Sequence, residues 1–150
     1  MLILSLSAGA AFAVTLTGTS GGDALRGTSG TDVLNGLEGN DLLKGFAGED
    51  RLYGGPGHDG LYGGAGDDTI RGGAGDDRLE ERRVYGGSGN DVLYGDAGSD
   101  ALHAGPGNDK VIATGEAPGD RVDCGPGTDT VQRSFRSPYD VFINCERFVN

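Results

Sequence analysis

The fold is decided by residues 54–80, which read GGPGHDGLY (54–62), GGAGDDTIR (63–71) and GGAGDDRLE (72–80). These three consecutive units of nine share the pattern G-G-x-G-x-D-x-U-x, in which U is a large aliphatic residue; its positions are numbered 1 to 9 below. Glycine permits positive φ and tight turns. The tripeptide x-U-x suits a short strand with its aliphatic side chain pointing inward. Each unit therefore predicts one turn followed by one strand.

The same register extends over most of the chain. Aspartates recur at position 6, with an interruption of five residues after residue 80 and a slip of two residues after Asp109; they are Asp23, Asp32, Asp41, Asp50, Asp59, Asp68, Asp77, Asp91, Asp100, Asp109, Asp120 and Asp129. Every one is followed two residues later by Leu, Ile or Val, and all but Asp120 are preceded two residues earlier by glycine. Such internal periodicity predicts a solenoid, whereas a flexible acidic linker would need no fixed register.

Composition excludes several other classes. The chain has 31 glycines in 150 residues and a net charge of −11, from 12 Lys and Arg against 23 Asp and Glu. So much glycine disfavours helices, and its spacing does not fit collagen. The acidic balance argues against a nucleic-acid partner. The length allows one domain and leaves little room for a separate catalytic one.

The units resemble the RTX, or hemolysin-type, calcium-binding nonapeptide repeats over roughly residues 18–132. The resemblance implies an all-β fold, a right-handed parallel β-roll with two units per coil, and calcium ions held between turns n and n+2. The side-chain ligands that it implies are Asp23, Asp32, Asp41, Asp50, Asp59, Asp68, Asp77, Asp91, Asp100, Asp109 and Asp129. The turn glycines that it implies at these sites are Gly54, Gly57, Gly63, Gly66, Gly72, Gly75, Gly86 and Gly89.

Repulsion between the stacked aspartates also favours calcium binding. Stacked coils place every second aspartate in one column, so that Asp23, Asp41 and Asp59 share one edge while Asp32 and Asp50 share the other. Two bare carboxylates about 5 Å apart repel by roughly 3 kcal/mol at an effective dielectric constant of 20. Calcium accepts carboxylate and carbonyl oxygens, whereas the two histidines and two cysteines are too scattered for zinc. We therefore expect several Ca²⁺ ions, and an ordered roll only when they are bound.

The ends of the chain fall outside the repeat. Residues 1–13 form an apolar run that ends in Ala11-Phe12-Ala13, which is typical of a signal peptide; a buried N-terminal strand is the alternative. Residues 81–85 are expected to form an inserted loop in a β-roll that spans residues 14–132. Residues 133–150 are expected to cap the last coil. A disulfide between Cys124 and Cys145 would tie this cap, and two free thiols are the alternative.

The predicted function is that of a secreted, extracellular calcium-binding module with a structural or interaction role. The sequence contains no H-E-x-x-H motif, and neither His58 nor His103 has a Ser or Cys partner at a recognisable spacing, so no enzyme activity is expected. The alternatives are the repeat domain of a secreted enzyme or toxin, and a calcium-dependent adhesin. Calcium ions are the expected partners, together with an unidentified extracellular or cell-surface partner; neither nucleic acid nor a membrane-spanning segment is expected.

Overall fold

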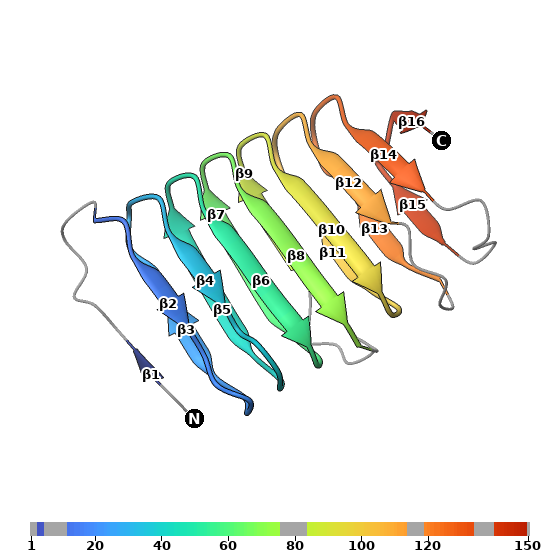
Figure 1. The fold of residues 1–150 in the computed structure, drawn as a ribbon. Helices are drawn as coiled ribbons and strands as arrows, with labels where there is room; N and C mark the ends of the chain where they lie inside the picture. Colours follow the sequence, from blue (N-terminus) through green and yellow to red (C-terminus); the bar gives the residue numbers. More distant parts are fainter. Residues whose placement is uncertain (1–2, 5–11, 76–83, 114–118, 134–139, 150) are drawn as a thin grey trace.

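The computed structural model describes residues 3–4, 12–75, 84–113, 119–133 and 140–149. These residues form two parallel β-sheets that face each other, and they contain no helix (Figure 1). None of the described segments could therefore cross a membrane as a helix. The architecture is the parallel β-solenoid that the nine-residue period predicts.

The chain crosses from one sheet to the other with each successive strand. The first sheet contains β1 (Ile3–Leu4), β3 (Ala24–Arg26), β5 (Leu42–Ala47), β7 (Gly60–Ala65), β9 (Val84–Ser88), β11 (Ala101–His103), β13 (Arg121–Asp123) and β15 (Val141–Ile143). The second sheet contains β2 (Thr15–Thr17), β4 (Val33–Asn35), β6 (Arg51–Pro56), β8 (Thr69–Ala74), β10 (Val92–Ala97), β12 (Lys110–Ala113), β14 (Thr130–Arg133) and β16 (Arg147–Val149). Two repeat units therefore make one coil.

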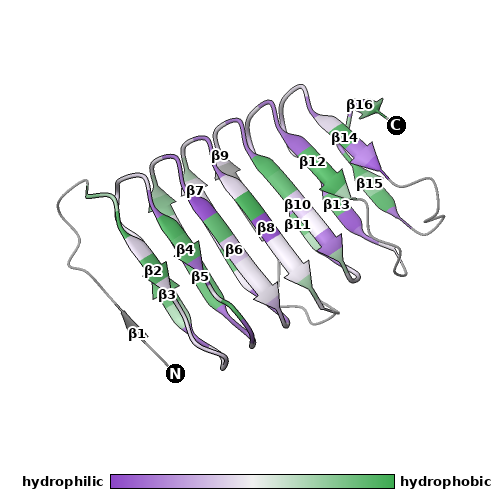
Figure 2. Cartoon of the chain, in the orientation of Figure 1, coloured by the Kyte–Doolittle hydropathy of each residue, from purple (hydrophilic) through white to green (hydrophobic). Residues whose placement is uncertain are grey.

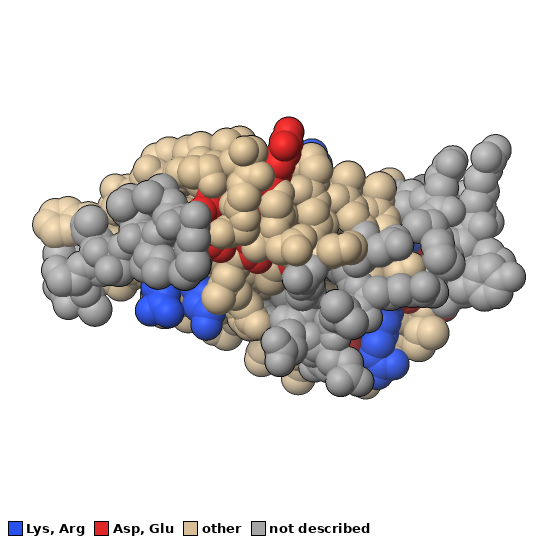
Figure 3. Space-filling view, turned by 90° about the horizontal axis from the view of Figure 1, so that it is seen from below, with Lys and Arg blue, Asp and Glu red and all other residues tan. Residues whose placement is uncertain are grey.

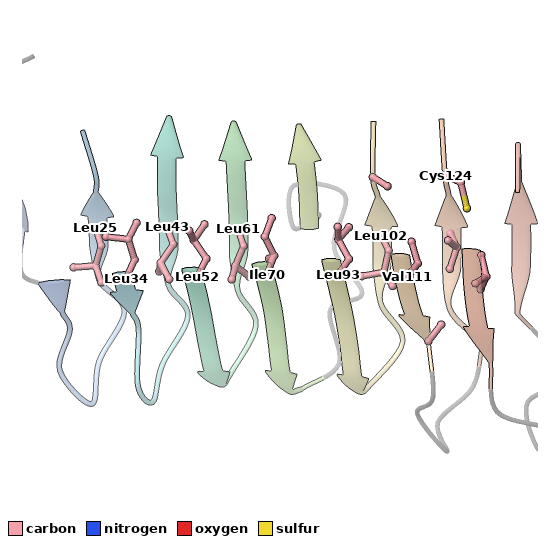
Figure 4. Packing of buried hydrophobic residues seen from close by; sticks show 14 of the residues in the cluster. Leu25, Leu34, Leu43, Leu52, Leu61, Ile70, Leu93, Leu102, Val111 and Cys124 are labelled. Carbon is pink, nitrogen blue, oxygen red and sulfur yellow. The ribbon is translucent and has the colours of Figure 1, made fainter. Parts of the chain in front are cut away.

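The aliphatic residues at position 8 form the core. Leu25 pairs with Leu43 and Leu43 with Leu61 in one sheet, and their side chains point toward those of the opposite sheet (Figure 4). Hydrophobic residues recur at this place in strand after strand (Figure 2). The buried members of the column are Leu16, Leu25, Leu34, Leu43, Leu52, Leu61, Ile70, Leu93, Leu102, Val111, Val122 and Val131. The core is thus one side chain wide on each sheet.

The central strands are longer than the predicted tripeptides. Strands β5 to β8 and β10 run for six residues each, because the backbone at positions 2 and 3 of the turn also pairs between coils. For example, Gly55 is paired with Gly73, and Pro56 with Ala74. The absence of a β-carbon at the glycine positions allows these backbones to approach closely.

After the interruption that follows residue 80, the ladder of the first sheet continues at Val84. Val84 lies between Leu61 and Leu102 in the ladder, at the place where the sequence register would put Leu79. Val84 and Tyr85 therefore belong to β9, and the predicted inserted loop, 81–85, ends earlier than expected. The physical reason is that Val84-Tyr85 supplies a second U-x ending. Asp77 and Leu79 lie outside the described residues.

The C-terminal segment continues the roll instead of leaving it. Strand β15 pairs with β13 and β16 pairs with β14, each in parallel, so residues 141–149 add one strand to each sheet. The disulfide Cys124–Cys145 links this last coil to the preceding one, as predicted. Phe142 packs edge-on against Phe148, with ring centroids 5.2 Å apart. Whether this coil also acts as a cap, as the sequence suggested, remains a prediction.

The outer faces carry the residues of position 9. Lys44 Nζ lies 4.9 Å from the centre of the Tyr62 ring, and the Arg71 guanidinium lies 4.5 Å from that of Tyr94. Arg71 also forms an ion pair with Asp96 at 3.4 Å. Each cation therefore covers the aromatic ring of the next coil on the same sheet.

Candidate metal centre

The position-6 aspartates lie immediately before the strands, at the two edges of the roll. Although they carry charge, the described ones are all at most 5% exposed: Asp23, Asp32, Asp41, Asp50, Asp59, Asp68, Asp91, Asp100, Asp109, Asp120 and Asp129. On the face shown in Figure 3, narrow strips of acidic surface lie between other residues, and acidic atoms project outward at one place. Carboxylates are almost never this deeply buried unless they are paired or coordinate a metal.

One oxygen of each carboxylate takes part in a ladder that joins the coils. The Oδ1 atom of Asp50 accepts a hydrogen bond of 2.8 Å from the backbone N–H of Asp32, and Asp68 does the same for Asp50 at 2.9 Å. The other bonds of this kind are Asp23 to Asp41, Asp41 to Asp59, Asp68 to Asp91, Asp91 to Asp109, Asp100 to Asp120 and Asp109 to Asp129, donor first. The ladder crosses the interruption between Asp68 and Asp91, and it confirms the two predicted columns wherever they are described.

The second oxygen has no such partner in the interior turns. The Oδ2 atoms of Asp41, Asp50, Asp68, Asp91, Asp109 and Asp129 are buried and accept no hydrogen bond from the described protein. A buried acceptor without a donor costs about 1–3 kcal/mol, and more when it is charged. These atoms therefore call for a ligand that carries positive charge.

Backbone carbonyls converge on the same places. The Cα of Gly45 is approached by Asp50 Oδ2 from its own turn and by the Gly63 carbonyl from the next coil, so a β-carbon there would overlap both oxygens. Gly36 is crowded in the same way by Asp41 and Gly54, and Gly54 by Asp59 and Gly72. Oxygen atoms from two coils thus gather around a space that only glycine leaves open. Gly54, Gly63 and Gly72 are three of the glycines that the sequence implicated.

The other implicated glycines lie differently. The carbonyls of Gly57, Gly66, Gly75 and Gly89 each point at the Cα of the glycine one coil further on, and Gly86 lies within β9. A β-carbon at Gly66, which has a φ of +125°, would overlap the Gly48 carbonyl. Position 4 therefore requires glycine for the stacking of turns. The role of this group at a metal site stays a prediction.

Burial changes the acidity of the columns. Burial, opposed by the Asp50 N–H and reinforced by the neighbouring carboxylates, raises the pKa of Asp68 to about 7. The same causes raise the pKa of Asp50, Asp91 and Asp109 to about 6. They also raise the pKa values of Asp41, Asp120 and Asp129. The charged forms of these carboxylates are thus unfavourable without compensation, mainly because they are buried and to a smaller extent because they repel one another.

The first two turns satisfy their aspartates without a ligand. The N–H of Thr19 donates to Asp23 Oδ2 at 2.5 Å, and the Thr19 hydroxyl donates to the same atom at 2.9 Å. In the next turn the N–H of Thr28 donates to Asp32 Oδ2 at 2.5 Å, and the Thr28 hydroxyl lies 3.3 Å from each oxygen of that carboxylate. Threonine at position 2 thus supplies hydrogen bonds to the Oδ2 atom, which a cation could bind in the other turns.

Two carboxylates of the ladder were missed from the sequence. Asp140 accepts the N–H of Asp120 at 3.0 Å, and Glu146 Oε2 accepts that of Asp129 at 2.9 Å. The signal was present, because Phe142 and Phe148 follow these acids by two residues, as the aliphatic follows each aspartate. Only three residues separate β15 from β16, and the longer Glu side chain reaches the ladder from this short turn.

A second ladder runs outside the first. The side-chain oxygens at position 5 accept backbone N–H groups from the next coil: Asn40 from His58, Asp67 from Asn90, Asn90 from Asn108 and Asn108 from Thr128, at 2.8–2.9 Å. These bonds hold the turns in register at the exposed edge.

The donor set of the interior turns fits a hard cation. Among the described residues, no three His, Cys, Asp or Glu side chains gather into a metal cluster. The oxygens that do converge are single carboxylates and peptide carbonyls, which calcium accepts at six to eight positions. The orphaned Oδ2 atoms and the space over Gly36, Gly45 and Gly54 are what such an ion would need.

Comparison with known proteins identifies the repeat. A model of the RTX calcium-binding nonapeptide repeat matches four times, at residues 17–45, 26–61, 61–80 and 83–111. No curated protein and no solved structure matches the chain. The matched segments cover more than half of the sequence and contain most of the buried aspartate ladder. On this evidence the chain belongs to the family of RTX calcium-binding nonapeptide repeats.

Proposed function

We propose that this chain is a secreted calcium-binding module whose β-roll becomes ordered when Ca²⁺ ions fill the interior turns. The observation that carries the proposal is the row of buried Oδ2 atoms that accept no hydrogen bond from the described protein. In the turns of Asp41 and Asp50, a backbone carbonyl of the next coil also lies beside the carboxylate. Calcium would supply positive charge to oxygens that are already arranged around it. Each ion would join two neighbouring coils of the roll.

The proposed ions belong to the turns that have no threonine at position 2. Their carboxylates are those of Asp41, Asp50, Asp59, Asp68, Asp91, Asp100, Asp109 and Asp129, and the carbonyls of Gly54, Gly63 and Gly72 are supporting ligands. We place no ion against Asp23 or Asp32, because Thr19 and Thr28 already donate to their Oδ2 atoms. This departs from the set that the family resemblance implied. We therefore expect fewer ions than aspartates.

We expect folding to depend on metal binding because each repeat unit buries only one aliphatic side chain in the core. Each unit of nine orders its backbone at about 1–2 kcal/mol per residue and buries one aliphatic side chain, which contributes about 1.5–3 kcal/mol. Ligand binding to the folded state alone adds stability in proportion to the logarithm of ligand concentration. Extracellular calcium modules have dissociation constants of about 10⁻⁴–10⁻³ M, so the roll would order after export.

Its role is structural or interactive. The repeat accounts for the greater part of the described residues, and its regularly spaced backbone N–H groups donate hydrogen bonds that hold neighbouring coils together. We propose that the ordered roll acts as a scaffold that presents its outer faces. An assay of the purified protein for hydrolase activity tests this against the alternative of a repeat domain with enzymatic function.

The metal proposal is tested by far-UV circular dichroism in EDTA and then in millimolar calcium, with isothermal titration to count the ions. We expect β-structure to appear with calcium, and not with the same concentration of magnesium, which demands a smaller octahedral site. Asp50→Asn together with Asp68→Asn should lower the ion count. Asp67→Asn is the matched control, because Asp67 is exposed on the outer ladder. A spectrum that calcium does not change would contradict the proposal.

A further inference from the structure

The column that contains Asp32 begins with a residue that occupies an aspartate position but is not an aspartate. Val14 lies 18 residues before Asp32, and Leu16 follows it by two as the first buried residue of the core column. The Val14 backbone nitrogen donates a hydrogen bond of 2.8 Å to Asp32 Oδ1. It therefore makes the contact that the N–H of Asp32 makes to Asp50 one coil later. Val14 is the first rung of this column.

The environment of Asp32 differs from that of the later aspartates. Asp32 is 0% exposed. Asp32 Oδ2 accepts a hydrogen bond from the Thr28 N–H. The remaining oxygen, Oδ1, faces the residue one coil earlier, which is Val14. Asp50 has a carboxylate on each side, whereas Asp32 has Val14, which carries no side-chain charge. A positive charge on the Val14 nitrogen would compensate the buried carboxylate at the end of its column.

The sequence before Val14 offers a way to create that charge. Ala11-Phe12-Ala13 has small residues on both sides of Phe12, the pattern that precedes cleavage of an exported chain. Phe12 and Ala13 are exposed, with Phe12 at 60%, whereas Val14 is partly buried and packs against the core. The exposed side chains thus end at Ala13, although the Thr28 hydroxyl donates a hydrogen bond of 2.5 Å to the Phe12 carbonyl.

We propose that a peptidase cleaves the chain between Ala13 and Val14, and that the new ammonium group of Val14 binds the Asp32 carboxylate as the first rung of its column. Hydrolysis adds one water across the peptide bond, leaving a carboxylate on Ala13 and the ammonium on Val14. This deepens the export part of the proposed function and rests on it. The amide contact of the uncleaved chain then becomes a charge-assisted one at the same place.

The cleavage is tested on the full chain exported by a bacterial host. The intact mass and N-terminal sequence of the recovered protein should show Val14 as the first residue. A protein that keeps residues 1–13, or that begins at another position, would overturn the proposal. In that case strand β1, which pairs with β3 in the structure, would remain part of the mature roll.

The role of the ammonium is tested by a cycle that combines cleavage with a substitution. The melting temperature is measured in calcium for the exported chain and for the uncleaved full chain made in the cytosol, each with and without Asp32→Asn. We expect this substitution to lower the melting temperature by about 4 °C more in the cleaved chain. Equal losses in the two chains would show that the ammonium has no special role.

Asp67→Asn is the matched control, because Asp67 also accepts a backbone N–H at 2.8 Å but lies far along the chain from Val14. Its effect should be the same in both chains. Calcium-induced circular dichroism of the exported protein keeps the two proposals separate. A correct N-terminus without a calcium response would contradict the calcium proposal and leave the cleavage standing.

Discussion

The turns at residues 18–23 and 63–68 each place an aspartate directly before a strand, but the two aspartates have different surroundings. In the first turn, Thr19 donates two hydrogen bonds to Asp23 Oδ2. In the second turn, position 2 is Gly64, with a φ of +119°, and Asp68 Oδ2 accepts no hydrogen bond from the described protein. The residue at position 2 thus distinguishes two kinds of turn. In one kind the turn itself donates hydrogen bonds to the aspartate Oδ2, and in the other Oδ2 is left for a ligand.

The absence of glycine alone does not cause the difference. Leu37 and Phe46 also replace the position-2 glycine, but they keep positive φ values of 77° and 86°. Asp41 and Asp50 in those turns leave Oδ2 without a hydrogen bond from the described protein. Neither Thr19 nor Thr28 has a positive φ. The two kinds of turn therefore differ in whether the position-2 residue donates to the aspartate, as Thr19 and Thr28 do with their backbone N–H groups.

The largest expected effect is that of pH on the metal-free protein. Because burial raises the pKa of Asp68 to about 7 and those of Asp50, Asp91 and Asp109 to about 6, the folded chain binds more protons than the unfolded chain between about pH 4 and 7. Stability in EDTA should therefore fall as the pH rises through this range. Circular dichroism should show β-structure gained on acidification from about pH 8 to pH 5.

The same series in excess calcium should show the opposite trend, because protons then compete with the ion for the carboxylates. If the metal-free chain responds to acid no more than the loaded chain does, the interior turns do not hold destabilised carboxylates. The difference between these turns and the threonine turns would then not be a difference in carboxylate charge.

The next effect concerns glycine at position 4. Gly66→Ala places a β-carbon onto the Gly48 carbonyl at a φ of +125°, whereas at Gly21 the nearest atom is Thr19 Oγ1 at 4.0 Å. We expect Gly66→Ala to cost about 3 kcal/mol, or roughly 10 °C in melting temperature. Gly21→Ala should be neutral or stabilising by about 0.5 kcal/mol. Thermal melts in calcium check both, and similar losses would show that the two kinds of turn stack alike.

A third comparison is between the two ends of the roll. The first coil is closed by hydroxyl groups and the last by the Cys124–Cys145 disulfide. Cys145→Ser should lower stability by about 3 kcal/mol under oxidising conditions, because the unfolded chain regains the freedom of the closed loop. In a reducing buffer the variant and the parent should melt together. A variant as stable as the oxidised parent would show that the last coil needs no covalent link.

The smallest effect is that of a single hydroxyl. Thr19→Ala removes the 2.9 Å bond to Asp23 and should cost about 1 kcal/mol, with the exposed Thr31→Ala as its control. Replacing both Thr19 and Thr28 by glycine should instead open two turns and raise the calcium count measured by titration. An unchanged count would mean that threonine does not determine which turns accept an ion.

Much of this arrangement could be predicted from the repeat. A constant register fixes which side chains stack, so the two sheets, the core column and the two aspartate columns follow from Asp23, Leu25 and their repeats alone. The link between Cys124 and Cys145 was also foreseen, on the basis of export. The sheets and columns depend only on spacing, which a sequence displays directly, whereas the disulfide was inferred from the expected compartment.

The remaining features depend on backbone conformation and on register outside the repeat. The Asp32 N–H to Asp50 Oδ1 bond needs the direction of an amide, which no residue pattern states. Glu146 joins the ladder although its turn is shorter than a repeat unit, and a search for units of nine passes over it. The place of Val84 was ambiguous, because Leu79 offered the same side-chain type in a better register.

The pairing of each strand with the one two further along has a consequence for how the molecule is made. Every ladder contact joins residues only 17 to 23 positions apart, from Thr130 with Arg147 to Leu61 with Val84. Parallel sheets usually fold slowly because their partners are distant in the chain. Here each new coil finds its neighbour as soon as about twenty more residues have emerged. A chain that leaves a narrow pore N-terminus first could therefore fold coil by coil from its N-terminal end, before its C-terminal residues have emerged.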